Sequence, residues 1–178
     1  MHGIVHRTLK EYVVAKTDEE SWSTVSERAA VEDQLYLLVT HYPDSDVQAI
    51  LDTLAEMSGY DRRLLERDFG RTLGPELLDT FKAHIKEPWD LEKFLEVLPR
   101  VTKEVAEKKA ETSVPDIETS VEAGTAELTY SSEREYCGMA HGILESIVST
   151  YDEEATVSKE VCVDDGADRC VFAVEWEG

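Results

Sequence analysis

Three polar side chains, Tyr130, Ser132 and Arg134, lie two residues apart at the end of a predicted strand. Alternation along a strand puts Tyr130 and Ser132 on one face, and Arg134 at the strand-to-helix turn can reach the same side. Two hydroxyls and a guanidinium are suited to a ligand that carries carboxylates, because arginine grips a carboxylate with two parallel hydrogen bonds. The triplet therefore predicts a binding site for an anionic ligand. The alternative is structural, with Arg134 paired to Glu133 or Glu135 and Tyr130 in the core.

A second set of reactive side chains lies near the C-terminus, where all three cysteines are found. Cys137 and His141 are four residues apart on a predicted helix, so they point the same way. Cys162 and Cys170 flank a turn-rich loop and can face each other across a hairpin. Three thiolates and one imidazole form the closed tetrahedral set that structural zinc prefers. The alternative is three small buried cysteines without a metal.

The composition excludes several classes of function. Lys and Arg total 18 against 39 Asp and Glu, a net charge of −21, which opposes nucleic-acid binding. The acids are dispersed, which favours a halophilic cytoplasmic protein over an acidic mesophilic one. No run of about 18 apolar residues predicts a membrane span, and the N-terminus is unlike a signal peptide. The chain shows no Ser-His-Asp order and no phosphate loop, so we expect a binding protein and not an enzyme.

The periodicity of apolar residues predicts a single α+β domain over residues 1–178. Residues 1–109 read as a helical part, and residues 110–125 as a linker with a first extended segment. Residues 126–178 read as a small antiparallel sheet with a packed helix, the helix running from about residue 134 to 150.

Local signals predict where the helices begin and end. Capping boxes at residues 17–20 and 45–48 are expected to open two helices. Gly138 and Gly142 form a smooth helix face that would admit the sheet or a flat ligand. Glycine and proline are expected to end, break or kink the helical pattern at Gly59, Gly70, Gly74-Pro75 and Pro99.

The triplet at residues 130, 132 and 134 resembles the Tyr-x-Ser-x-Arg haem-propionate motif of the H-NOX family, the haem nitric oxide/oxygen binding domains. The opening MHGIVHRTLKEYVV and the segment ILDTLAEMSGYDRRLLERDFGRTL are also similar to that family, so the resemblance spans nearly the whole chain. It implies a haem between two subdomains, with its propionates on Tyr130, Ser132 and Arg134. It further implies a stand-alone sensor of nitric oxide or another diatomic gas. No output domain follows residue 178, so we expect it to signal through a separate protein.

The family holds the haem iron with a histidine on the helix before the linker, in a segment resembling Leu-Asp-x-Leu-His. The corresponding segment here is Leu98-Pro99-Arg100-Val101-Thr102, which places Thr102 at the ligand position. Threonine is a poor iron ligand. His84, or His2 and His6 on the first helix, are the alternatives.

The cysteine spacings resemble those of the 4-vinyl reductase domain, which can hold zinc through cysteines and an acidic residue. This likeness makes Glu160 a competitor of His141 for the fourth ligand position. It implies an alternative function, a zinc-containing, non-haem sensor module that binds a small carboxylate ligand in its pocket.

Overall fold

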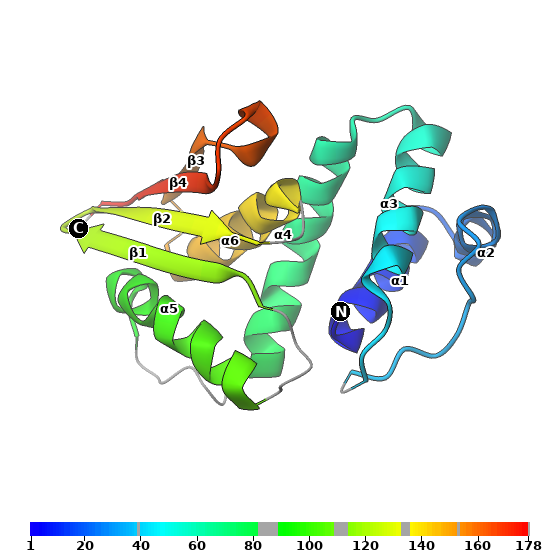
Figure 1. Cartoon of the computed structure of the whole chain (residues 1–178), viewed down its shortest axis with the longest axis horizontal. Helices are drawn as coiled ribbons and strands as arrows, with labels where there is room; N and C mark the ends of the chain where they lie inside the picture. Colours follow the sequence, from blue (N-terminus) through cyan, green and yellow to red (C-terminus); the bar gives the residue numbers. More distant parts are fainter. Residues whose placement is uncertain (39, 82–88, 109–113, 133–135, 153, 178) are drawn as a thin grey trace.

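The computed structural model describes residues 1–38, 40–81, 89–108, 114–132, 136–152 and 154–177. Figure 1 shows α1 to α3 on one side of the long helix α4, and the sheet with α5 and α6 on the other. The helices are α1 (Gly3–Lys16), α2 (Glu19–Arg28), α3 (Asp44–Ser58), α4 (Arg62–Phe81), α5 (Leu91–Lys108) and α6 (Cys137–Tyr151). The strands are β1 (Asp116–Glu122), β2 (Thr125–Ser131), β3 (Thr156–Val161) and β4 (Cys170–Glu175), with a short 3₁₀ helix η2 (Val163–Asp165) before β4.

The sheet is antiparallel throughout, in the order β1-β2-β4-β3. Its inward side chains, such as Leu128 and Phe172, pack with α6 and α5 into one hydrophobic core. A second core joins α1 to α4 and includes buried apolar residues of α1 such as Leu9 and Tyr12. The α+β architecture predicted from the sequence is confirmed. In the described part of the chain, no helix is long and apolar enough to cross a membrane.

Strand β1 lies within residues 110–125, for which the sequence predicts a linker with a first extended segment. The sequence places a charged connection over much of this region, but Asp116–Glu122 pairs along its whole length with β2. The strand alternates between exposed acids and partly buried residues such as Ile117 and Val121. An edge strand of this kind carries charge on its open face. The exposed acids therefore hid the alternation of apolar and polar residues that indicates a strand.

The two capping boxes are misplaced by one or two residues. The N-cap of α2 is Asp18, whose side chain accepts a hydrogen bond from the Ser21 amide. Thr17 instead ends α1, where its hydroxyl donates to the Val13 carbonyl at 2.7 Å. Helix α3 begins at Asp44 after Pro43, ahead of the expected cap at residue 45. Gly59 ends α3 in the left-handed conformation, as predicted.

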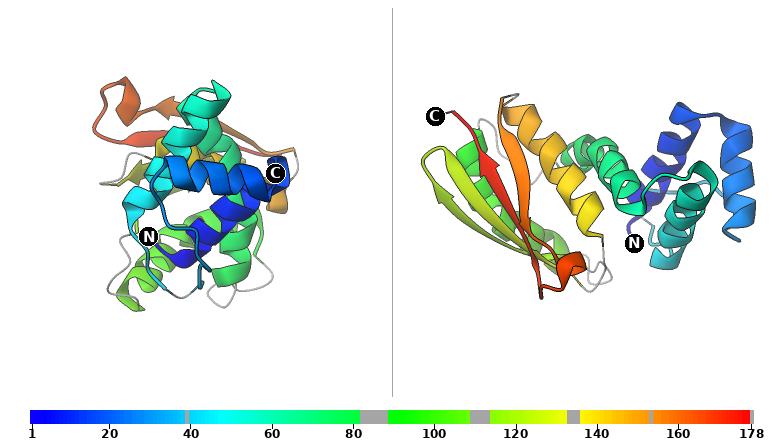
Figure 2. Two further views of the ribbon diagram at one scale, coloured as in Figure 1. Left: turned by 90° about the vertical axis from the view of Figure 1, so that its right-hand side faces the viewer. Right: turned by 90° about the horizontal axis from the view of Figure 1, so that it is seen from above.

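Helix α4 is continuous through Gly70 and Gly74-Pro75, which were expected to break it. These glycines face α6: a Cβ on Gly70 would lie 2.3 Å from the Met139 carbonyl oxygen. A Cβ on Gly142 of α6 would lie 1.9 Å from the Arg67 carbonyl oxygen. What the smooth face of α6 admits is therefore α4, and not the sheet or a flat ligand. Figure 2 shows α4 lying between α6 and the α1–α3 group.

Helix α5 packs on the sheet, although the sequence grouped it with the helical part. Leu91, Phe94 and Leu95 belong to the core under the sheet, and the Thr119 hydroxyl of β1 donates to the Leu95 carbonyl at 2.9 Å. The helix continues through Pro99. In space, the helical lobe is thus α1 to α4, and the sheet lobe is α5, α6 and β1 to β4.

Glu145 of α6 pairs with two arginines of α4, and stability is expected to depend on pH through its carboxylate. Its carboxylate accepts hydrogen bonds from Arg67 Nε at 3.0 Å and Arg71 Nε at 2.8 Å. Burial alone would raise the pKa of Glu145, but the two guanidinium groups outweigh it and lower the pKa to about 2. Stability from this carboxylate is therefore fully present above pH 4.5, its usual pKa, and is lost as the pH falls toward 2.

We expect Glu145→Gln to lower the free energy of unfolding at pH 7 by about 2 kcal/mol, after allowance for the exposure of the arginines. The variant should also lose less stability than the parent chain between pH 5 and pH 2, as measured by urea unfolding. Glu118→Gln on the exposed face of β1 is the control for loss of one charge. If the free energies of unfolding of the parent and Glu145→Gln fell equally between pH 5 and pH 2, the ion pairs of Glu145 with α4 would be contradicted.

Candidate functional site

A cavity of about 320 Å³ lies between the two hydrophobic cores. It is lined by the start of α1, by α4, α5 and α6, and by inward residues of β1, β2 and β4. Most of the lining side chains are apolar, including Leu73, Phe94, Leu128 and Ile143. The volume falls within the range of small-molecule pockets, which combine apolar walls with a few polar groups.

Tyr130 and Ser132 form a polar end of this cavity. Tyr130 is the last inward residue of β2, paired with Ile117 on β1 and Cys170 on β4. Ser132 directly follows the strand. The structure therefore puts these two predicted residues on one cavity wall, as the alternation suggested. Arg134, the third predicted residue, lies outside the described residues.

Thr102 lines the cavity from α5, together with Phe94, Leu98 and Val101. Its hydroxyl donates to the carbonyl oxygens of Leu98 and Pro99, both at 3.0 Å. The hydroxyl proton is thus committed to the helix backbone. Among the described residues that α5 contributes to the cavity, none carries an imidazole or a thiol.

The opposite lobe contributes Met1, His2, Ile4 and Val5 to the cavity. His2 is buried, and its ring meets the ring of His41 edge to face at 5.5 Å. His6, one turn later, is buried but lies outside the lining; its Nε2 is 3.0 Å from the Pro43 carbonyl oxygen. Burial lowers the pKa of His6, so its ring stays neutral at pH 7. His84 lies outside the described residues.

The three cysteines converge beside the sheet. The Sγ atom of Cys137 lies 3.2 Å from that of Cys162 and 3.1 Å from that of Cys170, while Cys162 and Cys170 are 3.8 Å apart. All three are reduced and buried. Burial, followed by the neighbouring sulfurs, raises the pKa of Cys137. Among the described residues, these three sulfur atoms lie close enough together to bind one metal ion.

Charged groups surround this thiol cluster. Asp164 Oδ2 lies 3.6 Å from the Cys137 sulfur and 3.5 Å from the Cys162 sulfur. Arg63 Nε holds the same carboxylate oxygen at 3.1 Å, and Lys159 Nζ lies 3.2 Å from the Cys162 sulfur. Burial would lower the pKa of Lys159, but its hydrogen bond to Cys162 and the nearby anions raise it.

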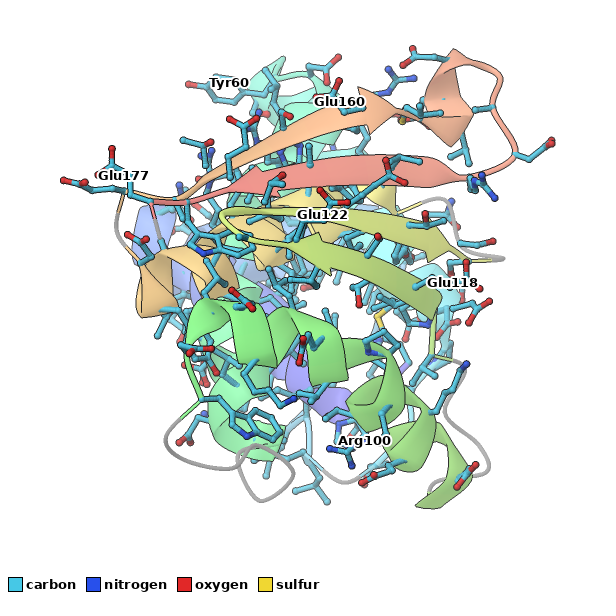
Figure 3. The ribbon with its side chains drawn as sticks, turned by 90° about the vertical axis from the view of Figure 1, so that its left-hand side faces the viewer. Tyr60, Arg100, Glu118, Glu122, Glu160 and Glu177 are labelled. Carbon is cyan, nitrogen blue, oxygen red and sulfur yellow. The ribbon has the colours of Figure 1, made fainter. Side chains whose placement is uncertain are left out.

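Neither predicted fourth ligand reaches the cluster. His141 turns its Nε2 toward the Val157 carbonyl oxygen at 3.4 Å, and its ring packs on Phe172. Glu160 lies on β3 at the edge of the sheet, is exposed, and accepts a hydrogen bond from Ser158. Figure 3 shows Glu160 on the outer side of the sheet. Asp164, by contrast, contacts two of the three sulfurs, those of Cys137 and Cys162.

Sequence reasoning assigned Asp164 and Lys159 no role. Asp164 belongs to the turn-rich loop between Cys162 and Cys170, where its residue type does not distinguish a metal ligand from a turn residue. Lys159 comes near Cys162 because the pairing of β3 with β4 is irregular between Lys159 and Val161. An irregularity of this kind leaves no mark in the sequence pattern.

Comparisons with known proteins agree with the fold. The haem-NO-binding family profile matches residues 2–159. An H-NOX protein from S. oneidensis in the Fe(II)NO ligation state is 24% identical, with a TM-score of 0.90 over 100% of each chain. A histidine-to-glycine mutant of the SO2144 H-NOX domain from Shewanella oneidensis, in the Fe(II)CO state, is 24% identical, with a TM-score of 0.86 over 100% of this chain and 99% of that one. A double mutant of Tt H-NOX is 18% identical, with a TM-score of 0.86 over 100% and 96%.

Among curated protein sequences, none matches the chain.

Proposed function

We propose that this chain, which belongs to the haem-NO-binding (H-NOX) family, binds haem in the cavity between its lobes and senses nitric oxide. Members of the family are haem-binding gas sensors, and the structural neighbours include NO and CO complexes. The observation that carries the proposal is the apolar cavity with Tyr130 and Ser132 at one end.

A haem needs apolar walls, partners for its carboxylates and an iron ligand, and the residues present supply the first two. The apolar walls suit a flat macrocycle, and the hydroxyls of Tyr130 and Ser132 suit its carboxylates. Arg134 would add a guanidinium at the same end, as the family motif implies. The third point, an iron ligand on α5, is not met, because Thr102 occupies that wall. When bound, haem would supply an iron centre that takes up a diatomic gas.

The lining of the cavity favours nitric oxide among the diatomic gases. Hydrogen-bond donors around a haem are a main factor in its choice of gas. On the α5 wall the Thr102 hydroxyl already donates to the helix backbone. Directly before α6, the Tyr136 hydroxyl donates to the Asp44 carbonyl oxygen at 3.3 Å. With these two hydroxyls committed, neither donates to a bound dioxygen, and nitric oxide depends less on such donors.

Signalling would proceed through movement of one lobe against the other. The cavity is bounded by both lobes, so a ligand that binds more tightly to one arrangement shifts the balance between them. The two lobes meet where α4 packs across α6, so this interface would accommodate the movement. We propose that a separate signalling protein reads the position of the helical lobe.

The double variant Tyr130→Phe/Ser132→Ala tests the proposed haem site. Loss of two hydroxyls should weaken haem binding by about 10-fold, at roughly 0.5–1.5 kcal/mol for each hydrogen bond. The measurement is titration of the haem-free protein with haemin, followed by visible absorption. Ser131→Ala, an exposed neighbour at the end of β2, is the matched control. Equal affinity of the parent and the double variant would argue against the predicted carboxylate end.

A zinc site is a second candidate, favoured by the three converging sulfurs. Zinc bound by thiolates at about 2.3 Å in a tetrahedron places the sulfurs about 3.8 Å apart. Cys162 and Cys170 already have this spacing, and Cys137 lies within 0.7 Å of it. Asp164 would complete a set of three sulfurs and one oxygen. Such a site would tie the start of α6 to the β3–β4 connection.

Metal analysis of the purified protein tests the zinc site. We expect one zinc per chain, released in Cys162→Ser because a structural site needs all of its ligands. Asp164→Asn should weaken zinc binding, while His141→Gln should leave it unchanged. Zinc lost in His141→Gln and retained in Asp164→Asn would contradict the arrangement of the cluster.

A further inference from the structure

The two walls of the cavity differ in the iron ligands that they offer. The α5 wall carries Thr102, whose hydroxyl is bound to its own helix. Among the described residues that line the cavity, His2 is the one imidazole, and none is a cysteine. Neutral imidazole and thiolate are the usual strong protein ligands of haem iron.

We infer that His2, on the wall formed by the helical lobe, is the residue of this chain that would hold the iron of a bound haem. The inference rests on the proposed haem function and deepens it, because it reverses the wall from which the iron is held. Thr102, Leu98 and Val101 of α5 would then line the side of the cavity that does not hold the iron.

The segment that carries His2 is held rigidly. The Met1 amine donates to the Tyr42 carbonyl oxygen at 2.6 Å, and the Tyr42 amide donates back to the Met1 carbonyl oxygen at 3.0 Å. The same amine forms an ion pair with Asp44. This clamp fixes the residue directly before His2. A fixed backbone lowers the entropic cost of placing a side chain as a ligand.

The residue after His2 is held as tightly. The Gly3 amide donates to the Thr40 carbonyl oxygen at 2.8 Å, and a Cβ at Gly3 would lie 2.0 Å from the Leu37 carbonyl oxygen. His2 itself pairs with His41 through a backbone bridge, and the two rings meet edge to face. An aromatic neighbour of this kind fixes the orientation of the His2 ring, which a metal ligand requires.

Other donors of the cavity are weaker candidates. Met139 on α6 offers a thioether, which serves as an iron ligand chiefly alongside histidine. The phenol of Tyr136 donates to the Asp44 carbonyl oxygen. The phenol of Tyr130 lies at the carboxylate end with Ser132. His2 therefore combines the preferred donor type, burial and a fixed backbone.

The test compares haem binding by the parent chain, His2→Ala and His2→Gln. The affinity tag belongs at the C-terminus, because the Met1 amine is part of the clamp. Even partners that only orient a metal ligand are worth about 10- to 100-fold in affinity, so loss of the ligand should weaken haem binding at least ~10-fold. The electron paramagnetic resonance and visible spectra should lose the signature of histidine ligation. Free imidazole added to His2→Ala should restore them.

Two controls separate ligation from folding. His6→Gln removes a buried imidazole of α1 that lies outside the lining, and Met139→Leu removes the thioether. His6→Gln should retain the parent spectrum, whereas Met139→Leu alters the cavity wall and tests the thioether as the competing ligand. Circular dichroism reports whether each variant folds. Should His2→Ala misfold, His2→Gln provides the same readout with a polar side chain of similar length.

The outcomes are distinct. Haem binding that is unchanged in His2→Ala and His2→Gln, or lost in Met139→Leu instead, overturns the assignment of His2 and leaves the haem function standing. A parent chain that takes up no haem overturns the proposed function, and the assignment of His2 falls with it. Weakened binding with rescue by imidazole supports both.

Discussion

Gly142→Ala should destabilise the protein by about 3 kcal/mol, although alanine is the better helix former. In an ordinary helix the same change stabilises by roughly 0.5–1 kcal/mol. Here the new Cβ would lie 1.9 Å from the Arg67 carbonyl oxygen and 2.9 Å from the Arg71 amide nitrogen. Both contacts are with the backbone of α4, so the two helices must move apart. The sign of the effect is therefore reversed, and urea unfolding measures it directly.

The same substitution should weaken haem binding. Leu73 of α4 and Ile143 of α6 both line the cavity, so separation of the helices distorts its walls. Ser149→Ala on the exposed side of α6 is the control, because it changes helix propensity without touching α4. If Gly142→Ala proved as stable as Ser149→Ala, the close crossing of α4 and α6 would be wrong.

Thr102→His should strengthen haem retention at least ~10-fold, because it adds an imidazole on the α5 wall of the cavity. The substitution costs the helix little, since a threonine hydroxyl bonded back to the preceding turn slightly destabilises a helix. The rate of haem transfer to an acceptor apoprotein measures retention. In His2→Ala, the same change should restore a histidine-ligated spectrum from the other wall.

Arg100→His is the matched control, since it adds an imidazole to the exposed face of the same helix. It should leave the spectrum of the bound haem unchanged. A Thr102→His variant whose spectrum and haem release match those of Arg100→His would show that residue 102 does not face the haem.

The sequence predicted the elements where local pattern and burial agree. The helix at about residues 134–150 and the common face of Tyr130 and Ser132 are visible because their side chains repeat with the period of a helix or a strand. It failed at Gly70, Gly74 and Pro75, because a glycine that ends a helix and one that admits a neighbouring helix look alike in sequence. Only the packing of α4 against α6 distinguishes them.

The candidate sites were predictable to different degrees. Tyr130 and Ser132 were found from the period of a strand, and the three cysteines from their types and clustering. The fourth position of the thiol cluster was not, because it depends on how η2 turns Asp164 back toward Cys137 and Cys162. A contact set by a loop depends on tertiary geometry that periodicity does not encode.

The most direct measurement of the central claim is a crystal structure of the protein loaded with haem. The account predicts one haem between the lobes, with its carboxylates beside Tyr130 and Ser132 and its faces toward α5 and the start of α1. A haem bound on the outer surface, or a loaded crystal whose inter-lobe cavity holds only apolar side chains, would contradict it.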